Sequence, residues 1–471
     1  MDKNEIFKVT IEDMTNEGLG VGKVSGFPLF IKDAVIGDEI EVRVVKVKKT
    51  YGYGRVESII TPSPSRVDAP CSIARPCGGC QIMNMNYDAQ IQFKENKVIN
   101  NLTRIGGFSR SFIDEVKDNT LSAASPLRYR NKAQFPVGFN KNGAVVTGFY
   151  GGHSHDIVPC DDCLLLKEDC KDIVNAVKRW MGNYGVSAYN EEIGRGVVRH
   201  ILIRCGENTG EWMICLVINA DSLDEKHDTK GPGASKPSHV DALISALKEV
   251  LGDALKSVCI SVNKARNNVI LGDNYKVLYG EGYIHESLGD ITYRISPLSF
   301  FQVNSEQCVR LYNKVLEYGE FSGTEDVWDL YCGTGSISLF MARHVKCVHG
   351  IEIIPEAIED AKKNASDNGI KNADFIVGAA EDVFTEKMKN GASRPDIVVV
   401  DPPRKGCDEK LINTILKMSP RKVIYVSCDS ATLSRDLKLL CESAYALKKF
   451  SVVDQFPNTV HTEVICRLEI N

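Results

Sequence analysis

Short apolar runs alternate with longer amphipathic segments from about residue 291 to the C-terminus. Short apolar runs bounded by turn residues are typical of buried strands, and the amphipathic segments between them are typical of helices. Strands are predicted over 326–330, 345–351, 375–377, 397–400 and 423–426, with a helix over 355–368 and a C-terminal hairpin of 450–454 and 463–468. This alternation predicts an open, mostly parallel α/β sheet that ends in a hairpin.

Residues 4–60 show a different pattern, in which apolar and polar positions alternate between glycine turns. Such alternation predicts strands with one buried face, and several short strands in succession predict a small antiparallel barrel. The last strand pair, 42–56, has no acidic residue and carries Arg43, Lys46, Lys48, Lys49, Tyr51, Tyr53 and Arg55. Basic groups interleaved with aromatic rings suit a phosphate backbone and its bases. A solvated face of the barrel is the alternative.

The middle of the chain, residues 64–290, mixes the two patterns. Strands are expected over 129–137, 198–204 and 213–219, and the polar segment 221–240 is expected to form a long surface loop. A single core seldom grows past about 250 to 300 residues, so a chain of 471 residues needs more than one domain. We therefore expect three domains, 1–63, 64–290 and 291–471.

The composition is that of an ordinary soluble globular protein, with 43% apolar and 25% charged residues. Neither a secretory signal nor an apolar run long enough to cross a bilayer is apparent, so we expect a cytoplasmic protein without a membrane partner. The 16 cysteines are then expected to stay reduced or to bind metal. The net charge of -5 does not by itself indicate a nucleic-acid-binding protein, so that function must depend on local patches.

A glycine-containing turn follows the predicted strand 326–330. Gly333 and Gly335 let the backbone turn sharply and approach a ligand closely. Glu352 ends the next strand, where its carboxylate can accept hydrogen bonds from ribose hydroxyls. The third glycine of the dinucleotide fingerprint is missing, which favours S-adenosylmethionine over a nicotinamide cofactor. A tight turn with Ser336 as a helix cap, and no ligand, is the alternative.

The segment Asp401-Pro402-Pro403-Arg404 follows the strand 397–400, at the sheet edge where ligands bind in open α/β folds. Its consecutive prolines stiffen the loop, so that Asp401 can be aimed at a flat base or at the methyl donor. Related Pro-Pro-Tyr segments serve methylation of exocyclic amines. Arginine in place of the aromatic residue argues against that reaction.

Cys428 lies on a polar turn after the strand 423–426. Position C5 of a uracil is too weakly nucleophilic to take a methyl group, but a thiolate that adds to C6 makes the ring an enolate that can. The hydrogen at C5 must then be removed by a general base, for which Glu463 on the C-terminal hairpin is the candidate. The alternative is that Cys428 is a small buried hydrophobic residue, as most free cysteines are.

A second group of cysteines lies in the N-terminal half of the chain. Cys71, Cys77 and Cys80 fall within ten residues and are separated by turn-forming glycines, and Cys160 and Cys163 follow much later. Such a group can converge on one metal site that a distant cysteine completes, and the spacing allows either zinc or an iron-sulfur cluster. Reduced thiols without any metal are the alternative.

Together these motifs resemble the RNA (uracil-5-)-methyltransferase family. The resemblance covers nearly the whole chain and rests on 18–21, 47–51, 71–80, 130–132, 301–304, 329–335, 401–406, 426–429 and 456–463. The closest branch carries an N-terminal TRAM domain and a four-iron four-sulfur cluster and modifies 23S ribosomal RNA. The implied folds are an OB-like β-barrel (TRAM), an α+β central domain with the cluster, and a Rossmann-like class I methyltransferase domain that uses S-adenosylmethionine.

The resemblance also assigns roles to individual residues. It makes Cys428 the nucleophile and Glu463 the base. It places Gln302, Tyr331, Glu352 and Asp401 around the donor and base pocket, beside the turn of Gly333 and Gly335. It assigns the cluster to Cys71, Cys77, Cys80 and Cys163, the last preferred to Cys160 because it precedes the apolar run 164–166. It further implies that segment 83–115 packs with the catalytic domain and that the protein acts as a monomer.

Three alternatives remain at this point. A 5-methylcytosine enzyme would normally carry a second cysteine in the Asp-Pro-Pro segment, and none stands there before Cys407. A non-catalytic RNA-binding iron-sulfur factor would not need Cys428, Glu463 and Gln302. A transfer RNA 5-methyluridine enzyme would share all the motifs, because the RNA loop that is recognised is not encoded in a string of residues.

Overall fold

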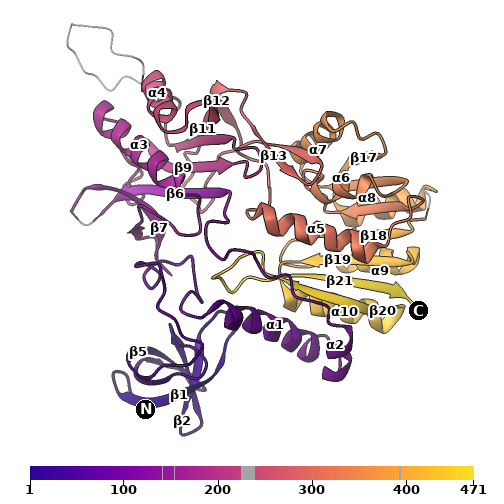
Figure 1. The fold of residues 1–471 in the computed structure, drawn as a ribbon, viewed down its shortest axis with the longest axis horizontal. Coiled ribbons are helices and arrows are strands. Elements are labelled where there is room, and N and C mark those ends of the chain that lie inside the picture. The colour runs from indigo at the N-terminus through magenta and orange to yellow at the C-terminus, as the bar shows by residue number, and fades with distance from the viewer. Residues whose placement is uncertain (141, 153, 224–238, 392–393) are drawn as a thin grey trace.

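The computed structural model describes residues 1–140, 142–152, 154–223, 239–391 and 394–471. The barrel, the central sheet and the C-terminal α/β sheet form three separate bodies of structure, with the barrel at the lower left of Figure 1 and the α/β sheet at the right. Residues 224–238, most of the loop expected over 221–240, lie outside the described residues. Within the described part of the chain, no helix combines the length and apolarity needed to cross a membrane.

The N-terminal strands close into a barrel in the order β1-β2-β3-β5-β4. They are β1 (Ile6–Met14), β2 (Gly20–Val24), β3 (Phe27–Lys32), β4 (Glu39–Val47) and β5 (Gly52–Thr61). Alternate apolar residues point inward and form a core of their own, as the alternating sequence pattern predicts. Gly54 is required where β5 crosses this core, because a Cβ there would lie 2.2 Å from the Val42 side chain.

The central region is a seven-stranded sheet in the order β12-β11-β10-β9-β6-β7-β8. Its strands are β6 (Lys132–Phe139), β7 (Val145–Tyr150), β8 (Ile157–Pro159), β9 (Val198–Cys205), β10 (Trp212–Ile218), β11 (Leu255–Val262) and β12 (Tyr275–Gly280). Helices α3 (Asp169–Tyr184) and α4 (His239–Leu251), with the short 3-10 turn η1 (Gly252–Ala254), bury their apolar faces in the same core. The strands predicted over 198–204 and 213–219 are therefore confirmed.

The C-terminal sheet has the order β17-β16-β15-β18-β19-β21-β20. Its elements are α5 (Ser305–Gly319), β15 (Asp326–Leu330), α6 (Ser336–Ala342), β16 (Cys347–Glu352), α7 (Pro355–Asp367), β17 (Ala373–Val377), α8 (Ala380–Lys389), β18 (Ile397–Val400), α9 (Glu409–Met418), β19 (Lys422–Ser427), α10 (Ser430–Ser443), β20 (Tyr445–Val453) and β21 (Glu463–Ile470). Strands β15 to β19 are parallel, and β21 inserts antiparallel between β19 and β20. The predicted parallel sheet with a terminal hairpin is confirmed.

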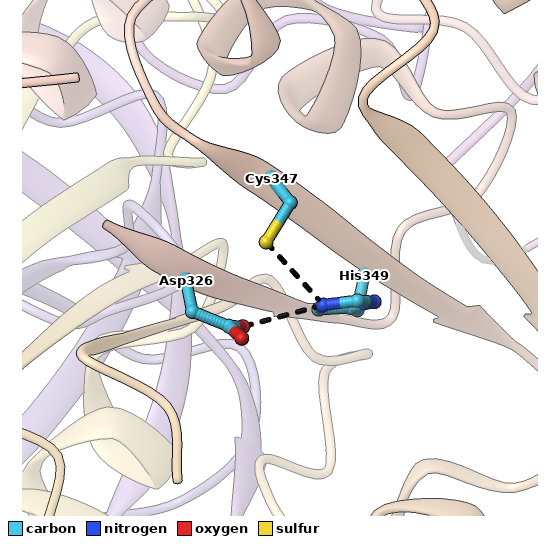
Figure 2. Close-up of side chains that lie close together, drawn as sticks. All are labelled: Asp326, Cys347 and His349. Carbon is cyan, nitrogen blue, oxygen red and sulfur yellow. Dashed lines mark hydrogen bonds and ion pairs between the residues drawn. The ribbon is translucent and has the colours of Figure 1, made fainter. Parts of the chain in front are cut away.

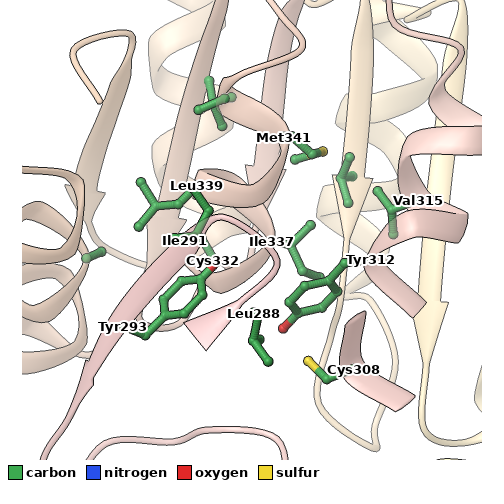
Figure 3. Close-up of a cluster of buried hydrophobic side chains, with 14 of the residues drawn as sticks. Leu288, Ile291, Tyr293, Cys308, Tyr312, Val315, Cys332, Ile337, Leu339 and Met341 are labelled. Carbon is green, nitrogen blue, oxygen red and sulfur yellow. The ribbon is translucent and has the colours of Figure 1, made fainter. Parts of the chain in front are cut away.

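A two-stranded hairpin of β13 (Ile284–Leu288) and β14 (Ile291–Ile295) joins the central sheet to the C-terminal sheet. Figure 3 shows Leu288, Ile291 and Tyr293 of this hairpin beside Ile337 and Leu339 of α6. The hairpin is therefore part of the core on one face of the C-terminal sheet. The domain boundary expected at residue 290 falls at the tip of this hairpin.

Two early helices, α1 (Tyr87–Arg104) and α2 (Arg110–Val116), lie against the C-terminal sheet although they precede the central sheet in sequence (Figure 1). Val98, Leu102 and Ile113 are buried in the same cluster as Leu433 and Leu437 of α10. The chain after α2 also forms parallel bridges to β20, from Lys117 to Phe450 and from Leu121 to Val453. Residues 83–115 thus contribute a helical layer to the C-terminal core.

Candidate active site

The turn after β15 is held in a geometry that few residues tolerate. Tyr331, Gly333 and Gly335 have φ angles of 76°, 56° and 78°. A Cβ on Gly335 would lie 3.0 Å from Phe375 and 3.1 Å from Ala361, so a side chain there would be both strained and crowded. The turn therefore leads directly into α6, with the N–H groups of Tyr331 and Cys332 bonded to the Ile351 carbonyl.

Glu352, at the end of β16, lies beside this turn. Its carboxylate accepts hydrogen bonds from the backbone N–H of Gly333 at 3.2 Å and of Ile354 at 3.0 Å. These two hydrogen bonds fix the orientation of the Glu352 carboxylate at the edge of the candidate site. The strand-end carboxylate expected from the sequence is thus placed where a ribose could reach it.

Two acidic residues stand at the reversal point of the sheet, between β15 and β18: Asp329 is buried and Asp401 is half-buried. Asp329 accepts a hydrogen bond from the Ser338 hydroxyl at 2.5 Å, and burial raises the pKa of Asp329 to about 7. Asp401 follows β18, and burial together with the charge of Asp329 raises the pKa of Asp401 to about 7. Ligands of open α/β sheets bind at such a reversal point, which makes Asp401 a wall of the candidate pocket.

Cys428 and Glu463 are brought together by strand register. Strands β19 and β21 pair antiparallel with Ser427 opposite Val464, so the next position in the same register sets Cys428 opposite Glu463. Asp429 then caps α10 by accepting from the N–H groups of Ala431 and Thr432, which ends the strand just after Cys428. The predicted nucleophile and the predicted base are therefore neighbours in space.

Charged groups near Cys428 and Glu463 shift the pKa values of both residues. Burial, Glu463 and Asp401 raise the pKa of the Cys428 thiol to about 11, and Arg404 opposes them. Glu463 is 3% exposed, and its burial and the charge of Asp401 raise the pKa of its carboxyl well above the usual range. The Cys428 thiol is therefore protonated in the resting site, and its attack on a substrate must be coupled to loss of that proton.

The loop from β20 to β21, which leads to Glu463, is anchored by α1. Lys94 and Asp454 form an ion pair with both side chains fully buried, and the Lys94 ammonium also donates to the Phe456 carbonyl at 2.9 Å. Tyr87 donates its hydroxyl to Asp454 at 2.7 Å, and the Gln90 side chain accepts from the N–H of Asn458 at 2.9 Å. Helix α1 thus contributes to the shape of the site although it lies far from it in sequence.

Gln302 lies in the loop before α5 and makes hydrogen bonds to Asn131 of the central region and to Gln455 of the loop that leads to Glu463. Its carbonyl accepts a hydrogen bond from the Asn131 amide at 2.9 Å, and its side-chain oxygen accepts from Gln455 at 3.5 Å. Asn131 also donates to the Ser305 hydroxyl at 2.9 Å. The side chain of Asn131, a residue of the 130–132 motif, therefore holds the Gln302 loop in place.

Several cations lie around His461, a grouping that the sequence did not reveal. Partial burial together with the charges of Arg404, Lys97, Lys94 and Arg130 lowers the pKa of His461. Lys97 donates to the Val460 carbonyl at 3.0 Å, next to His461. Arg404, Lys97 and Arg130 can attract phosphates, whereas Lys94 is buried and paired with Asp454. The members of this grouping come from four separate segments, so no local charge pattern could have disclosed it.

Cys71, Cys77, Cys80, Cys160 and Cys163 lie on loops of the N-terminal half. Burial and the charges of Cys163, Cys77 and Cys71 raise the pKa of Cys80 to about 12, and Cys71, Cys80 and Cys163 lie around the same small apolar cluster. Hydrogen bonds from the Cys160 thiol and from the N–H groups of Leu165 and Leu166 lower the pKa of Cys163. The charge of Arg130 acts on Cys80, on Cys163 and on His461, so the Arg130 guanidinium lies near both the cysteines and His461.

The spacing of the sulfur atoms bears on which metal group they fit. Thiolates around a single zinc ion stand about 3.8 Å apart, given Zn–S bonds of about 2.3 Å. Among the described residues, no three of these sulfur atoms lie within 4.8 Å of one another. Thiolates of an iron-sulfur cluster bind different irons and stand farther apart. Cys71, Cys80 and Cys163 also share one apolar shell with Met83, Tyr129 and Leu165, and neither Cys77 nor Cys160 is a member of that shell.

Three aromatic rings lie together on the barrel, on the surface that the sequence suggested for RNA binding. Phe30, Tyr51 and Tyr53 lie with ring centroids 5.3 to 6.0 Å apart. Arg43, one of the basic residues of 42–56, donates two hydrogen bonds to Glu57 at 2.8 and 2.9 Å. This ion pair joins β4 to β5. Glu57 lies just outside the segment 42–56, so Arg43 has an acidic partner although that segment contains no acidic residue.

Comparisons with known proteins agree with this arrangement. A family model described as tRNA (uracil-5-)-methyltransferase matches residues 246–470, and a TRAM domain model matches residues 3–56. A protein named as an uncharacterised RNA methyltransferase of Halalkalibacterium halodurans is 45% identical over 470 residues, covering 100% of this chain and 98% of that protein. One of the same description from Bacillus cereus is 44% identical over 465 residues, covering 99% of this chain and 96% of that protein.

One solved structure is similar over the full length. The crystal structure of the tRNA (uracil-54, C5)-methyltransferase of Pyrococcus abyssi in complex with S-adenosyl-L-homocysteine is 27% identical, with a TM-score of 0.75. The alignment covers 98% of this chain and 99% of that one. The chain therefore belongs to the RNA (uracil-5-)-methyltransferase family, as an RNA methyltransferase with an N-terminal TRAM domain.

Proposed function

We propose that the protein methylates C5 of a uridine in RNA, with Cys428 as nucleophile and Glu463 as general base. The observation that carries the proposal is the strand register that sets Cys428 opposite Glu463, with Asp401 and Arg404 acting on both residues. Both groups come from one sheet of one chain, which supports a protein that acts as a monomer.

The turn after β15 would hold the methyl donor. S-adenosylmethionine, when bound, supplies a methyl group on a positively charged sulfur. Gly333 and Gly335 allow the close backbone approach that it needs, and the carboxylate of Glu352 is oriented for its ribose hydroxyls. Tyr331, Gln302 and Asp401 would complete the pocket for the donor and the target base. The bound S-adenosyl-L-homocysteine of the Pyrococcus abyssi enzyme supports this assignment.

The residues of the site then act in sequence. The Cys428 sulfur forms a bond to C6 of the uracil, which breaks the C5–C6 double bond and leaves C5 nucleophilic enough to take the methyl group. Asp401, with a pKa of about 7, is partly ionised at neutral pH and can accept the thiol proton. Glu463 removes the remaining proton from C5, the double bond forms again, and the C6–S bond breaks to release a thiolate.

RNA that contains 5-fluorouracil tests this mechanism directly. Fluorine at C5 cannot be removed as a proton, so the reaction should stop after methyl transfer with Cys428 joined to the RNA. We expect a protein-RNA adduct that survives denaturing electrophoresis, requires S-adenosylmethionine, and is absent for Cys428→Ala. No adduct with the wild-type protein, despite methylation of unmodified RNA, would contradict the mechanism. A non-catalytic RNA-binding factor would give neither product.

We further propose that Cys71, Cys77, Cys80 and Cys163 hold a four-iron four-sulfur cluster. The thiolate donor set and the apolar shell around Cys71, Cys80 and Cys163 support a metal group at this place, and the family resemblance favours the cluster over a zinc ion. The cluster would be structural, because methyl transfer needs no electron. It would keep the loops in place so that Arg130 faces the RNA near His461.

We propose 23S ribosomal RNA as the substrate, on the resemblance to the branch that carries both a TRAM domain and the cysteine set. Transfer RNA is the second candidate, because the Pyrococcus abyssi enzyme acts on uracil 54 of transfer RNA. The two are distinguished by mapping 5-methyluridine in both RNAs from cells with and without the gene. Loss of the modification from transfer RNA alone would contradict the ribosomal assignment.

A further inference from the structure

Three potential metal ligands lie at the end of the C-terminal sheet opposite to Cys428. Asp326 begins β15 and Cys347 begins β16, and these two residues are direct partners across the parallel ladder. His349 follows two positions after Cys347, and side chains two positions apart on a strand point to the same face. Figure 2 shows the Cys347 sulfur and an Asp326 oxygen both directed at the His349 ring.

The distances between these ligand atoms match those around a tetrahedral metal ion. The Cys347 sulfur lies 3.6 Å from Nε2 of His349, and Nε2 lies 3.3 Å from an Asp326 oxygen. Zinc bonds of about 2.3 Å to sulfur and about 2.0 Å to nitrogen or oxygen separate tetrahedral ligands by about 3.5 Å for S and N and by about 3.3 Å for N and O. All three ligand atoms lie within 4.8 Å of one another.

A fourth residue prepares the histidine for metal binding. Nδ1 of His349 is hydrogen-bonded to Asp374 on the neighbouring strand β17, which directs the lone pair of Nε2 toward Cys347 and Asp326. Histidine ligands of metal ions almost always make such a contact with a carboxylate or carbonyl through the other ring nitrogen. The Trp328 ring, with its centroid 4.8 Å from that of His349, packs against the imidazole.

We propose that Asp326, Cys347 and His349 bind a divalent transition-metal ion of the zinc type, with water in the fourth position. A thiolate, an imidazole and a carboxylate are the ligands that such ions prefer, whereas Mg²⁺ and Ca²⁺ take oxygen ligands. The site is half-buried, which leaves access for the ion and for the water. Strand β15 ends at the turn of Gly333 and Gly335, whereas the proposed metal site lies where β15 and β16 begin. It would therefore clamp β15 to β16 and take no part in methyl transfer.

Protons compete with the metal for this site. The hydrogen bond to Asp374 and the charge of Asp326 raise the pKa of His349, and nearby Lys387 opposes them. Burial and the carboxylates of Asp326 and Asp374 raise the pKa of Cys347, against the charge of Lys346. Metal binding must displace a proton from the thiol, and from the imidazole when that is protonated.

The test uses protein with its cysteine set intact, purified anaerobically and dialysed against a chelator. Titration with Co²⁺ should give thiolate-to-metal absorption that saturates at about one added ion per chain. Cys347→Ser should lose this absorption, and Asp374→Asn should weaken Co²⁺ binding about tenfold or more. Cys441→Ser, at a half-buried cysteine outside the site, should bind as wild type. Equal Co²⁺ absorption in wild type and Cys347→Ser would overturn the proposal.

A second measurement needs no variant that could misfold. Zn²⁺ should protect Cys347 of the wild-type protein from alkylation, as mapped by mass spectrometry, while Cys441 reacts at an unchanged rate. Methylation should proceed at the same rate with and without Zn²⁺. Alkylation of Cys347 that is indifferent to Zn²⁺ would overturn the site, and a methylation rate that depends on Zn²⁺ would overturn its structural role.

Discussion

The catalytic pair and the cysteine set both join residues that are distant in sequence, but they do so by different means. Cys428 and Glu463 lie at the ends of adjacent strands, and the ladder between β19 and β21 fixes their separation. Cys71, Cys77, Cys80 and Cys163 lie on loops, where turn hydrogen bonds such as that from the Cys77 N–H to the Ile73 carbonyl are the local constraints. The strand ladder therefore fixes the relative position of Cys428 and Glu463, whereas the arrangement of the four cysteines would depend more on the proposed cluster.

This comparison predicts that removal of the nucleophile affects activity and leaves the fold intact. Cys428→Ala should lower methylation by several orders of magnitude, because no other group can activate C5. Its thermal unfolding temperature and its affinity for RNA should stay close to wild type, since the ladder of β19 and β21 is unchanged. Cys441→Ala serves as the control with full activity. Turnover near wild type in Cys428→Ala would rule out this nucleophile.

Change of the base should stop the reaction at a later step. Glu463→Gln removes the carboxylate that takes the C5 proton but keeps the size of the side chain. We expect one methyl transfer followed by a covalent protein-RNA species on unmodified RNA, visible as a shifted band in denaturing electrophoresis. Sustained turnover without such a band would assign the base to another residue.

Substitution of a cysteine of the loop set should instead affect the stability of the fold. Cys163→Ser should lose most of the bound iron, with about four irons per chain expected in anaerobically purified wild type. It should also weaken RNA binding and lower the unfolding temperature. Cys160→Ser is the matched control and should keep its iron. Iron loss in Cys160→Ser but not in Cys163→Ser would reverse the assignment, and a colourless zinc-loaded wild type of full activity would remove the cluster.

Disruption of the buried ion pair between Lys94 and Asp454 tests whether the β19–β21 ladder alone fixes the positions of Cys428 and Glu463. Lys94→Met leaves the Asp454 carboxylate buried without its cation, which costs roughly 3 to 5 kcal/mol. We expect a lower unfolding temperature and a lower kcat, because the loop that leads to Glu463 loses its anchor. Lys410→Met, at the exposed pair with Asp382, should change neither quantity appreciably. Equal behaviour of the two variants would show that α1 does not support the site.

The smallest effect is expected from the redox state of the cluster. Methyl transfer moves no electrons between protein and substrate, so chemical reduction of an intact cluster should leave the methylation rate unchanged. The rate is measured anaerobically before and after reduction, with visible absorption as the check that the cluster persists. A strong dependence of the rate on the oxidation state would show that the two regions are chemically coupled.

Much of the C-terminal sheet could be predicted because its strands are buried on both faces. The predicted strands 326–330 and 397–400 coincide with β15 and β18, and the predicted helix 355–368 coincides with α7 to within one residue. A central parallel strand is a short continuous apolar run, which is visible locally. The hairpin of β13 and β14 was harder to assign, because its residues follow the central sheet in sequence but are buried with α6.

The sequence by itself determined the family, the order of the elements and the residues with chemical potential, because motifs and hydrophobic periodicity are local properties of the chain. Tertiary structure alone decided which of these residues are neighbours. The insertion of β21 between β19 and β20 sets Cys428 opposite Glu463, and the pairing of β15 with β16 brings Asp326 to Cys347 and His349. Strand order and register arise from the packing of the whole core, so periodicity along the chain carries no direct record of them.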